Sequence, residues 1–310
     1  MIPFFDSKTL ETRLPMPRLI EALRMAFQTD FHVPPRHHHA FSPPNTSLDS
    51  TLLLMPAWDA GAYLGVKTVI VSPENRQIGK PSIQGIYTLF DQKTGAPLAQ
   101  MDAPALTALR TAATSALAAS YLARSSADSL LVIGTGALAP WLIRAHAAIR
   151  PIRKVWIWGR NFEHAQKCCA RLRLPQADIL PVRRLKEVLP KADIISCATL
   201  SKTPLVEGKY LRAGQHLDLV GSYKPDMREA DDEVVKKAVI YADILENAIK
   251  ESGDLAIPLK SGILRKEDLR GDLPGLCRGQ FPGRENENDI TLFKSVGHAL
   301  EDLAAAILAY

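Results

Sequence analysis

The feature that most constrains the fold is an alternation of apolar runs and helical patterns from residue 129 to about residue 292. SLLVIGTG, which begins at residue 129, predicts a strand that enters a glycine turn, and a helical pattern follows over 138–149. Further helices are predicted at 162–172 and 183–190. Further strands are predicted in KVWIWGR, ADILPV, ADIISCAT, HLDLVGS and AVIYAD. This alternation is typical of a parallel, doubly wound α/β sheet.

The preceding part of the chain has a different texture. LETRL and PRLIEALRMAF predict two helices within residues 1–30, whereas residues 32–50 are rich in Pro, His, Ser and Asn and predict a loop. Residues 104–124 predict a long Ala-rich helix, and ITLFKSVGHALEDLAAAILAY at 290–310 predicts a final helix. Strands are expected in TLLLMPAW, AYLGVKTVIVS, SIQGIYTLFD and PLAQMD, with QKTG as a hairpin turn.

Composition excludes several classes of protein. The net charge of +5 comes from dispersed basic residues, so we expect no nucleic-acid partner, and a mild basic excess suits a small anionic ligand. No run of about 18 apolar residues predicts a membrane span, and the N-terminus does not resemble a signal peptide. The four cysteines lack a CxxC spacing, which favours a reducing, cytoplasmic location and no metal site.

The glycine turn has the pattern GxGxxA, formed by Gly134, Gly136 and Ala139. The first glycine permits a tight turn, the second allows a pyrophosphate to approach, and the third position needs only a small residue. Pro140 falls in the first helical turn, where a missing N–H costs little. We therefore predict dinucleotide contacts from Gly134, Thr135, Gly136, Ala137 and Leu138, the alternative being a purely structural turn.

The end of the second strand of this sheet bears on the choice of cofactor. NAD sites usually place an acid there for the ribose hydroxyls, but this strand ends in Trp158-Gly159-Arg160-Asn161. Arg160 can pair with a 2′-phosphate, and Asn161 can add a donor. NADP is therefore predicted over NAD, which stays possible because Arg160 could instead be a solvated residue at the strand end.

Several motifs together resemble the ornithine cyclodeaminase/mu-crystallin family. They are TALRTAATSA at 107–116, VIGTGALA after it, Gly65-Val66-Lys67, Val220-Gly221-Ser222-Tyr223-Lys224-Pro225-Asp226 and Lys294-Ser295-Val296-Gly297. The resemblance implies an NAD(P)-binding Rossmann domain, residues 124–292, inserted into a discontinuous α+β domain. That second domain, residues 1–123 and 293–310, is expected to bind substrate and form a homodimer.

The resemblance also implies roles for individual residues. Arg110, Lys67 and Arg36 match positions that hold the substrate carboxylate, and Lys67 is also a candidate catalytic group. An arginine in an Ala-rich helix independently indicates an anion, because burying its charge alone is costly, but Arg110 could instead reach solvent or a structural acid. Without the resemblance, Lys67 would be expected to face outward from its strand. Asp226 matches the acid/base residue near the reacting nitrogen, and Gly221 and Ser222 are expected beside the cofactor. The triplet at His37-His38-His39 lacks accompanying ligands at metal-site spacing.

The sequence departs from the cyclodeaminases of this family at three places. Their glutamate is replaced by Leu53, their threonine by Gly85, and their strand-end aspartate by Gly159-Arg160. These departures favour an NAD(P)H-dependent reductase that converts a ketimine carboxylate, such as pyrroline-2-carboxylate, to the amino acid. The alternatives are an ornithine cyclodeaminase that recycles bound NAD, and a non-catalytic crystallin-like protein that binds NADPH and a small ligand.

Overall fold

The chain forms two compact units. A computed structural model describes residues 1–59 and 61–310, apart from the side chain of Arg76. Unit 1 comprises Met1–Thr111 and His298–Tyr310, and unit 2 comprises Ala112–Gly297. The division falls inside the long Ala-rich helix, now α3 (Ala103–Leu122), whose residues are mostly buried. No helix in the described parts of the chain is long and apolar enough to cross a membrane.

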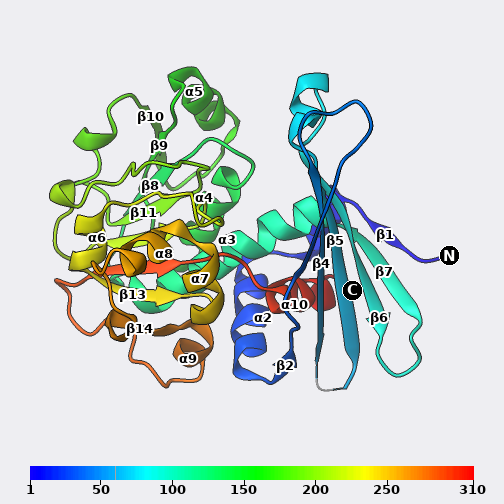
Figure 1. The fold of residues 1–310 in the computed structure, drawn as a ribbon. Helices are drawn as coiled ribbons and strands as arrows, with labels where there is room; N and C mark the ends of the chain where they lie inside the picture. Colours follow the sequence, from blue (N-terminus) through cyan, green and yellow to red (C-terminus); the bar gives the residue numbers. More distant parts are fainter. Residues whose placement is uncertain (60) are drawn as a thin grey trace. The chain divides into compact units, whose positions relative to one another are not determined.

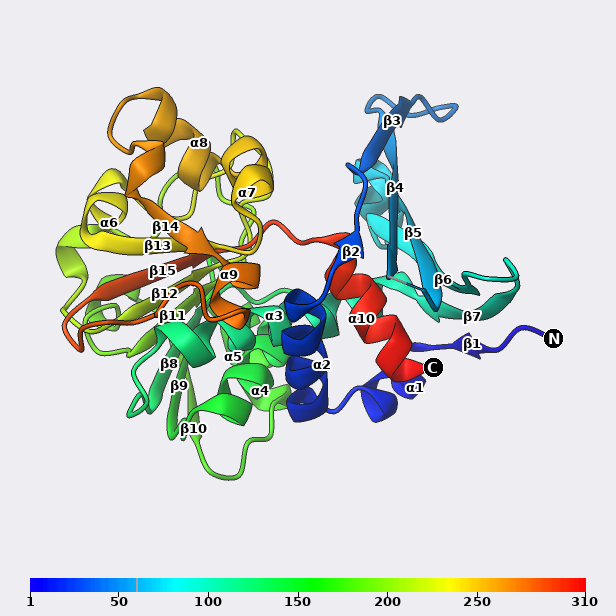
Figure 2. The same ribbon diagram turned by 90° about the horizontal axis from the view of Figure 1, so that it is seen from below.

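Unit 1 is built on a largely antiparallel sheet with the order β1-β7-β6-β5-β4-β2, and β3 also pairs with β4 (Figures 1 and 2). Its strands are β1 (Phe4–Phe5), β2 (Phe31–His32), β3 (His37–Phe41), β4 (Ser50–Asp59), β5 (Tyr63–Val71), β6 (Ile83–Asp91) and β7 (Pro97–Asp102). Its helices are α1 (Ser7–Arg13), α2 (Met16–Gln28) and α10 (Ala299–Ala309), with a 3₁₀ turn over Pro73–Ile78. The predicted helices at the N-terminus and the four central strands are confirmed.

One face of this sheet lies under helix α10, which packs against β4, β5 and β6. Side chains alternate between the two faces of a strand, so Gly65, Lys67 and Val69 of β5 share one face. All three are buried, and they pair with positions on β4 and β6 that are also mostly buried. The fold therefore places Lys67 on the helix-covered face rather than in solvent.

The loop predicted for residues 32–50 is partly wrong, because His37–Phe41 forms strand β3. The strand pairs antiparallel with β4, where His38 is opposite Leu53. Its residues are all exposed, so it shows no alternation of apolar and polar positions. Backbone hydrogen bonding to an existing edge made this strand, and side-chain patterning could not reveal it.

Unit 2 is the predicted parallel sheet, with the order β10-β9-β8-β11-β12-β15-β13-β14 and every neighbouring pair parallel. Its strands are β8 (Ser129–Ile133), β9 (Lys154–Trp158), β10 (Asp178–Val182), β11 (Ile194–Cys197), β12 (His216–Leu219), β13 (Ala238–Ala242), β14 (Leu269–Asp272) and β15 (Ile290–Lys294). Its helices are α4 (Ala139–Ile149), α5 (Phe162–Arg171), α6 (Asp232–Lys237), α7 (Leu245–Glu251), α8 (Gly253–Lys260) and α9 (Leu273–Cys277). The predicted fold class, a doubly wound Rossmann sheet, is confirmed.

Two helix predictions in this part are wrong. The pattern at 183–190 forms only a 3₁₀ turn over Leu185–Glu187, and the segment 290–294 forms strand β15 rather than the start of the last helix. Strand β15 lies between β12 and β13 and is buried throughout. A strand that is buried on both faces lacks the alternation of apolar and polar residues, so the pattern does not distinguish it from part of a buried helix.

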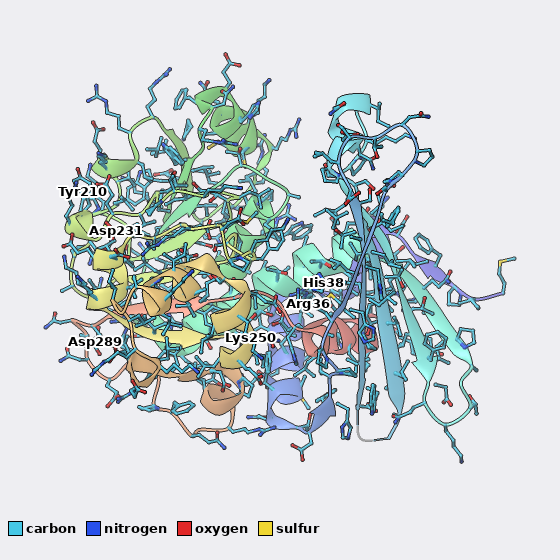
Figure 3. All side chains as sticks on the ribbon, viewed as in Figure 1. Arg36, His38, Tyr210, Asp231, Lys250 and Asp289 are labelled. Atoms are coloured by element: carbon cyan, nitrogen blue, oxygen red, sulfur yellow. The ribbon has the colours of Figure 1, made fainter. Side chains whose placement is uncertain are left out.

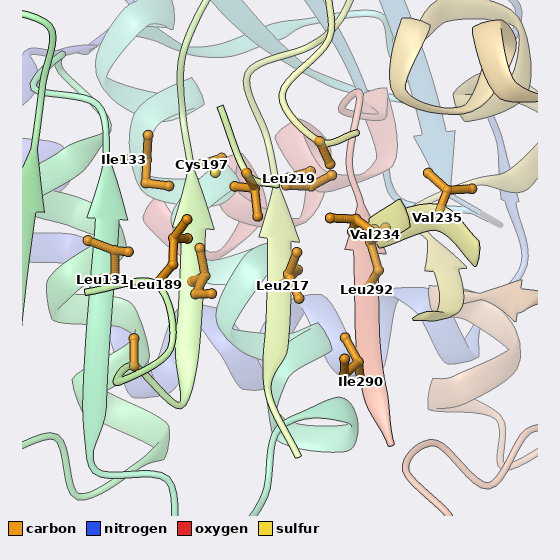
Figure 4. Packing of buried hydrophobic residues seen from close by; sticks show 14 of the residues in the cluster. Leu131, Ile133, Leu189, Cys197, Leu217, Leu219, Val234, Val235, Ile290 and Leu292 are labelled. Atoms are coloured by element: carbon orange, nitrogen blue, oxygen red, sulfur yellow. The ribbon is translucent and has the colours of Figure 1, made fainter. Parts of the chain in front are cut away.

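The core of unit 2 lies between this sheet and its helices (Figure 4). Figure 4 shows Leu131, Leu217 and Leu292 on strands β8, β12 and β15, with Val234 and Val235 of α6 on the side of Leu292. Burying each such side chain contributes roughly 1.5–3 kcal/mol relative to exposure. This packing holds the strand ends, and therefore the loops that follow them, in fixed positions.

A buried carboxylate joins two of these loops. Glu229 accepts hydrogen bonds from the N–H and hydroxyl of Thr199 after β11, both at 2.7 Å. It also accepts from the N–H groups of Gly221 at 2.8 Å and Ser222 at 3.2 Å after β12. Glycine is needed at 221, where a Cβ would lie 1.9 Å from the Thr199 carbonyl oxygen. Burial, partly opposed by Lys294, raises the pKa of Glu229 to about 7.

The raised pKa of Glu229 predicts a specific pH dependence of stability. Because the folded pKa lies above the usual value of 4.5, Glu229 favours folding below about pH 4.5, and this contribution is lost as the pH rises to about 7. In thermal or denaturant unfolding, the free energy of unfolding of the wild type should therefore fall relative to that of Glu229→Gln between pH 5 and 7, by roughly 1–3 kcal/mol. The exposed Glu246→Gln, whose parent carboxylate has its pKa lowered by Lys250, is the matched control and should show no such loss. A constant difference between wild type and Glu229→Gln over this range would contradict the expectation.

Candidate substrate and cofactor sites

Lys67 is buried at the centre of unit 1, with 4% of its surface exposed. Its Nζ lies 2.7 Å from Oδ2 of Asp302 and 3.4 Å from the hydroxyl of Thr107. Burial lowers the pKa of Lys67 to about 8, because the charged form is desolvated. Asp302 opposes this effect, while the positive charges of Arg110 and Arg36 add to it. Lys67 is thus a cation at neutral pH that titrates in an accessible range.

Arg110 lies beside Lys67 in the same network. Its Nε donates to Oδ1 of Asp302 at 2.8 Å, and its Nη1 donates to a carboxylate oxygen of Glu301. Burial acts to lower the pKa of Arg110, but Asp302 and Glu301 outweigh it and hold the pKa above its usual value. The sequence called for an anion next to this arginine, and two carboxylates of α10 supply it.

Arg36 completes a group of three cations in unit 1. Its charge lowers the pKa of Lys67, and burial together with Arg36 lowers the pKa of His38. Figure 3 shows Arg36 and His38 next to each other. His38 pairs with Leu53, which pairs with Val69, so these positions share the face of the sheet that carries Lys67. The structure therefore joins Lys67 and Arg110 through Asp302, and places Arg36 near enough for its charge to act on Lys67.

Sequence reasoning missed several members of this network. Glu301 and Asp302 are fully buried in the first turn of α10, and Tyr87 is fully buried on β6. A Cβ at Gly65 would lie 1.8 Å from the Tyr87 hydroxyl oxygen, which explains the glycine at that position. Burial and the charge of Asp302 raise the pKa of Tyr87. Two adjacent acids in an otherwise apolar helix were the available signal, of the same kind that singled out Arg110.

Asp226 lies in unit 2, on the loop after β12. Its side chain is 57% exposed and forms an ion pair with Lys202, with 2.7 Å between Oδ2 and Nζ. The hydrogen bond from Lys202 lowers the pKa of Asp226, so the group is a carboxylate at neutral pH. Its predicted role at the reacting nitrogen stays a prediction.

The predicted cofactor residues Gly134 to Leu138 lie together in unit 2, directly before α4. Gly134 has φ +130°, and a Cβ there would lie 2.7 Å from the carbonyl oxygen of Ala198. At Gly136 the position of a Cβ is open space, as a phosphate group approaching the backbone requires. Pro140 lies in the first turn of the helix, as predicted. The turn therefore has the geometry of a dinucleotide-binding loop, with Thr135, Ala137 and Leu138 completing it.

A hollow of about 450 Å³ lies beside this turn. Its lining includes the basic side chains of His164, Lys167 and Arg171 from α5. The remaining lining residues are Thr135, Gly136, Ala137, Pro140 and Cys168. Arg160 is exposed just before the helix, and Asn161 caps α5 by accepting from the N–H of Glu163 at 2.8 Å. Positive charge thus gathers where a nucleotide phosphate would need it.

Gly221 and Ser222, also predicted beside the cofactor, are held by internal hydrogen bonds. Their N–H groups donate to Glu229, and the Ser222 hydroxyl donates to the carbonyl oxygen of Met227 at 2.7 Å. Both residues are buried. In this structure they shape the loop between β12 and Asp226, and their contact with a cofactor stays a prediction.

The positions of the histidines and cysteines bear on metal binding and disulfide formation. Among the described residues, no group of three or more His, Cys, Asp or Glu side chains is placed to hold a metal ion. The histidines of β3 alternate between the faces of the strand. Cys168, Cys169, Cys197 and Cys277 are free thiols.

Comparison with known proteins identifies relatives over the whole chain. The chain is 34% identical over 306 residues to Delta(1)-pyrroline-2-carboxylate reductase of Colwellia psychrerythraea, covering 97% of this chain and 96% of the relative. It superposes with a TM-score of 0.93 on the Delta(1)-pyrroline-2-carboxylate reductase of Thermococcus litoralis in complex with NADH and L-proline. That match has 35% identity and covers 100% of this chain and 96% of the other.

A second solved structure is an archaeal alanine dehydrogenase dimer with bound NAD. Its TM-score is 0.90 at 29% identity, over 100% of this chain and 95% of that one. The sequence profile of the ornithine cyclodeaminase/mu-crystallin family matches residues 7–310. The chain therefore belongs to the ornithine cyclodeaminase/mu-crystallin family.

Proposed function

We propose that this protein is a cytoplasmic, nicotinamide-dependent reductase that converts a ketimine carboxylate, such as pyrroline-2-carboxylate, to the corresponding amino acid. The observation that carries the proposal is the cluster of Arg36, Lys67 and Arg110 in unit 1. Relatives of 34% and 35% identity that are named Delta(1)-pyrroline-2-carboxylate reductases support it. The four free thiols agree with a reducing compartment.

The cation cluster suits a small carboxylate. A guanidinium binds a carboxylate through two parallel hydrogen bonds, and a neighbouring ammonium adds a point charge. Lys67 and Arg110 come from different elements, β5 and α3, and ion pairs with α10 hold both side chains in place. Such fixed groups bind an anion without losing much side-chain entropy on binding.

The cofactor would be held by Gly134 to Leu138, with its pyrophosphate at the start of α4. When bound, the reduced nicotinamide supplies the hydride that the substrate carbon accepts. The residues of this turn contribute close backbone approach and the positive end of a helix dipole. The open space at Gly136 supports this fit.

Asp226 would act on the nitrogen of the imine. An imine accepts hydride more readily when its nitrogen is protonated, and a carboxylate stabilises that positive charge. Because Lys202 lowers the pKa of Asp226, the carboxylate form prevails at neutral pH. We therefore assign Asp226 to accepting a hydrogen bond from the protonated nitrogen, and to passing the proton directly or through water.

The alternative activity in this family is ornithine cyclisation, and this chain does not have the glutamate of the cyclodeaminases. A cyclodeaminase of this family has glutamate at the position of Leu53, and that glutamate is the expected partner of the second amino group of ornithine. In this chain Leu53 lies on the face of the sheet that carries Lys67, so the position is apolar. This observation favours a substrate without a second amino group.

Purified protein should oxidise NADPH when pyrroline-2-carboxylate is added, and should form proline. Asp226→Asn should lower kcat/KM by roughly 100-fold or more, because a positioned acid/base group typically contributes 10²–10⁴-fold. Absorbance at the nicotinamide band gives the rate, and amino-acid analysis gives the product.

Asp268→Asn is the matched control for this assay. Asp268 is an exposed aspartate of the same unit, also in an ion pair, with Arg265 at 2.9 Å. Its substitution should leave the rate unchanged. Release of ammonia and proline from ornithine without added reductant would contradict the proposed reaction.

For the cofactor we propose NADPH in preference to NADH. Arg160 and Lys167 present positive charge at and after the end of β9, the usual position of the adenosine ribose. No carboxylate follows Trp158 before α5 begins. Both features suit a 2′-phosphate better than a ribose hydroxyl.

Replacing Arg160 tests this preference. Arg160→Asp should raise KM for NADPH by roughly tenfold or more, since a hydrogen bond to a charged group contributes about 1.5–3 kcal/mol. KM for NADH should change less. Arg153→Asp, an exposed arginine just before the other end of β9, is the control. Equal loss with both cofactors, or better rates of the wild type with NADH, would overturn the NADPH assignment.

We further propose that the protein is a homodimer that pairs through the sheet of unit 1. The face of this sheet opposite Lys67 carries apolar side chains that are only partly buried. They are Leu52, Leu54, Trp58, Leu64, Val66, Ile70, Ile86 and Phe90. A contiguous exposed apolar patch favours association with a second copy. The related archaeal alanine dehydrogenase, described as a dimer, agrees with this.

Light scattering should give a mass of twice the 34.0 kDa chain for the wild type. Ile70→Arg should shift the protein toward the monomer, because an arginine would be desolvated in the interface. Ile70 is 41% exposed, and Leu180 of β10 is 44% exposed, so Leu180→Arg is a matched control that should remain dimeric. A monomeric wild type would contradict the proposal.

A further inference from the structure

Two adjacent acids of α10 stand at the centre of the cation cluster. Glu301 and Asp302 are both fully buried, in a helix that otherwise contains only alanine, leucine and isoleucine. A buried carboxylate is tolerated only when cations and hydrogen bonds compensate it. The start of a helix adds a modest favourable field. The cations that Glu301 and Asp302 bind therefore explain why these acids can be buried.

Asp302 bridges the two buried cations. Its Oδ2 lies 2.7 Å from Nζ of Lys67 on β5, and its Oδ1 accepts from Nε of Arg110 on α3 at 2.8 Å. The two oxygens of one carboxylate thus fix the relative position of side chains from two other elements. Glu301 binds Arg110 through a different nitrogen, Nη1.

The charges of this network nearly balance. Arg36, Lys67 and Arg110 carry three positive charges, and Glu301 and Asp302 carry two negative charges. The two acids thus offset two of the three positive charges. Without the two acids, three neighbouring cations would repel one another in a buried site.

We propose that Asp302 is a positioning residue that orients Lys67 and Arg110 toward the substrate carboxylate, whereas Glu301 contacts Arg110. The charge of Asp302 also favours the protonated form of Lys67. This inference rests on the proposed function of the cation cluster. It assigns to the C-terminal helix a part in substrate binding beyond packing against the sheet.

The groups that face Lys67 define the expected pH dependence. Asp302 of α10 raises the pKa of Lys67, whereas burial, Arg110 of α3 and Arg36 lower it. Tyr87 of β6 and Glu301 of α10 are the other titratable groups of the network. Charged Lys67 binds the carboxylate, so affinity should fall as the pH rises through about 8. Removing the charge of Asp302 should move this fall to lower pH.

The test is the pH dependence of kcat/KM with pyrroline-2-carboxylate for wild type, Asp302→Asn and Glu301→Gln. Asp302→Asn should raise KM more than it lowers kcat, and should move the alkaline fall down by roughly one pH unit or more. Glu301→Gln is the matched control. It should raise KM without moving the fall, because Arg110 stays charged at all these pH values. An unmoved alkaline fall in Asp302→Asn would overturn the proposal.

A second variant covers the case in which Asp302→Asn does not fold. Lys67→Arg replaces the titrating ammonium by a permanent cation, so the fall above pH 8 should disappear. Persistence of that fall in Lys67→Arg would overturn the proposal. The unfolding midpoint of each variant should be measured as well. It distinguishes a loss of stability from a loss of positioning.

A readout without turnover separates this inference from the proposed function. NMR of protein labelled at lysine gives the titration of Lys67, assigned by its loss in Lys67→Arg. L-proline should bind more weakly as Lys67 deprotonates, and Asp302→Asn should lower the titration midpoint. Wild type that binds L-proline in this manner but does not oxidise NADPH would refute the reductase activity alone. Turnover by wild type with an unchanged midpoint in Asp302→Asn would refute the positioning role alone.

Discussion

The carboxylate of Asp302, held between Lys67 and Arg110, is the interaction on which the candidate substrate site depends. Arg110 and Asp302 are 192 residues apart in sequence, and the whole of unit 2 lies between them. Each of the three charges would be strongly destabilising if buried alone. Together with Glu301 they compensate one another, so the site exists only when the last helix has returned to the sheet of unit 1. Folding of unit 1 and formation of the cation cluster are therefore the same event.

Unit 2 uses a buried carboxylate in a comparable way, although the partners are different. Glu229 gathers backbone N–H groups from two loops, whereas Asp302 gathers side-chain cations. Asp254 accepts from the N–H of Glu229 at 2.8 Å and lies 3.4 Å from Nζ of Lys294, so this network contains a cation as well. The two environments shift the pKa of these carboxyl groups in opposite directions. The pKa of Glu229 rises because burial outweighs its partners, and the pKa of Asp302 falls because two cations outweigh burial.

The sequence allowed the fold to be predicted where local patterns and final burial agree. Alternation of strands and helices predicted the parallel sheet, and the central strands of unit 1 were also found. The predictions were wrong where tertiary contacts determine the secondary structure. Examples are β3, which is exposed, and β15, which is buried on both sides. For the site, the charge of Arg110 in an apolar helix indicated a buried anion, whereas Lys67 was identified through the resemblance to the family, because a strand lysine alone is expected to face outward. Glu301 and Asp302 were not identified, because acids near the start of a helix are common and usually solvated.

The chain leaves strand β15 of the parallel sheet through a segment that Asp243 holds by hydrogen bonds. Asp243 accepts at Oδ2 from the Ser295 hydroxyl at 3.1 Å and from the N–H groups of Val296 at 2.7 Å and Gly297 at 2.6 Å. These bonds fix the direction in which the chain leaves the central strand β15. Helix α10 begins at Ala299, and Asp302 follows within its first turn. The backbone path out of the parallel sheet is thus set only a few residues before the carboxylate that organises Lys67 and Arg110.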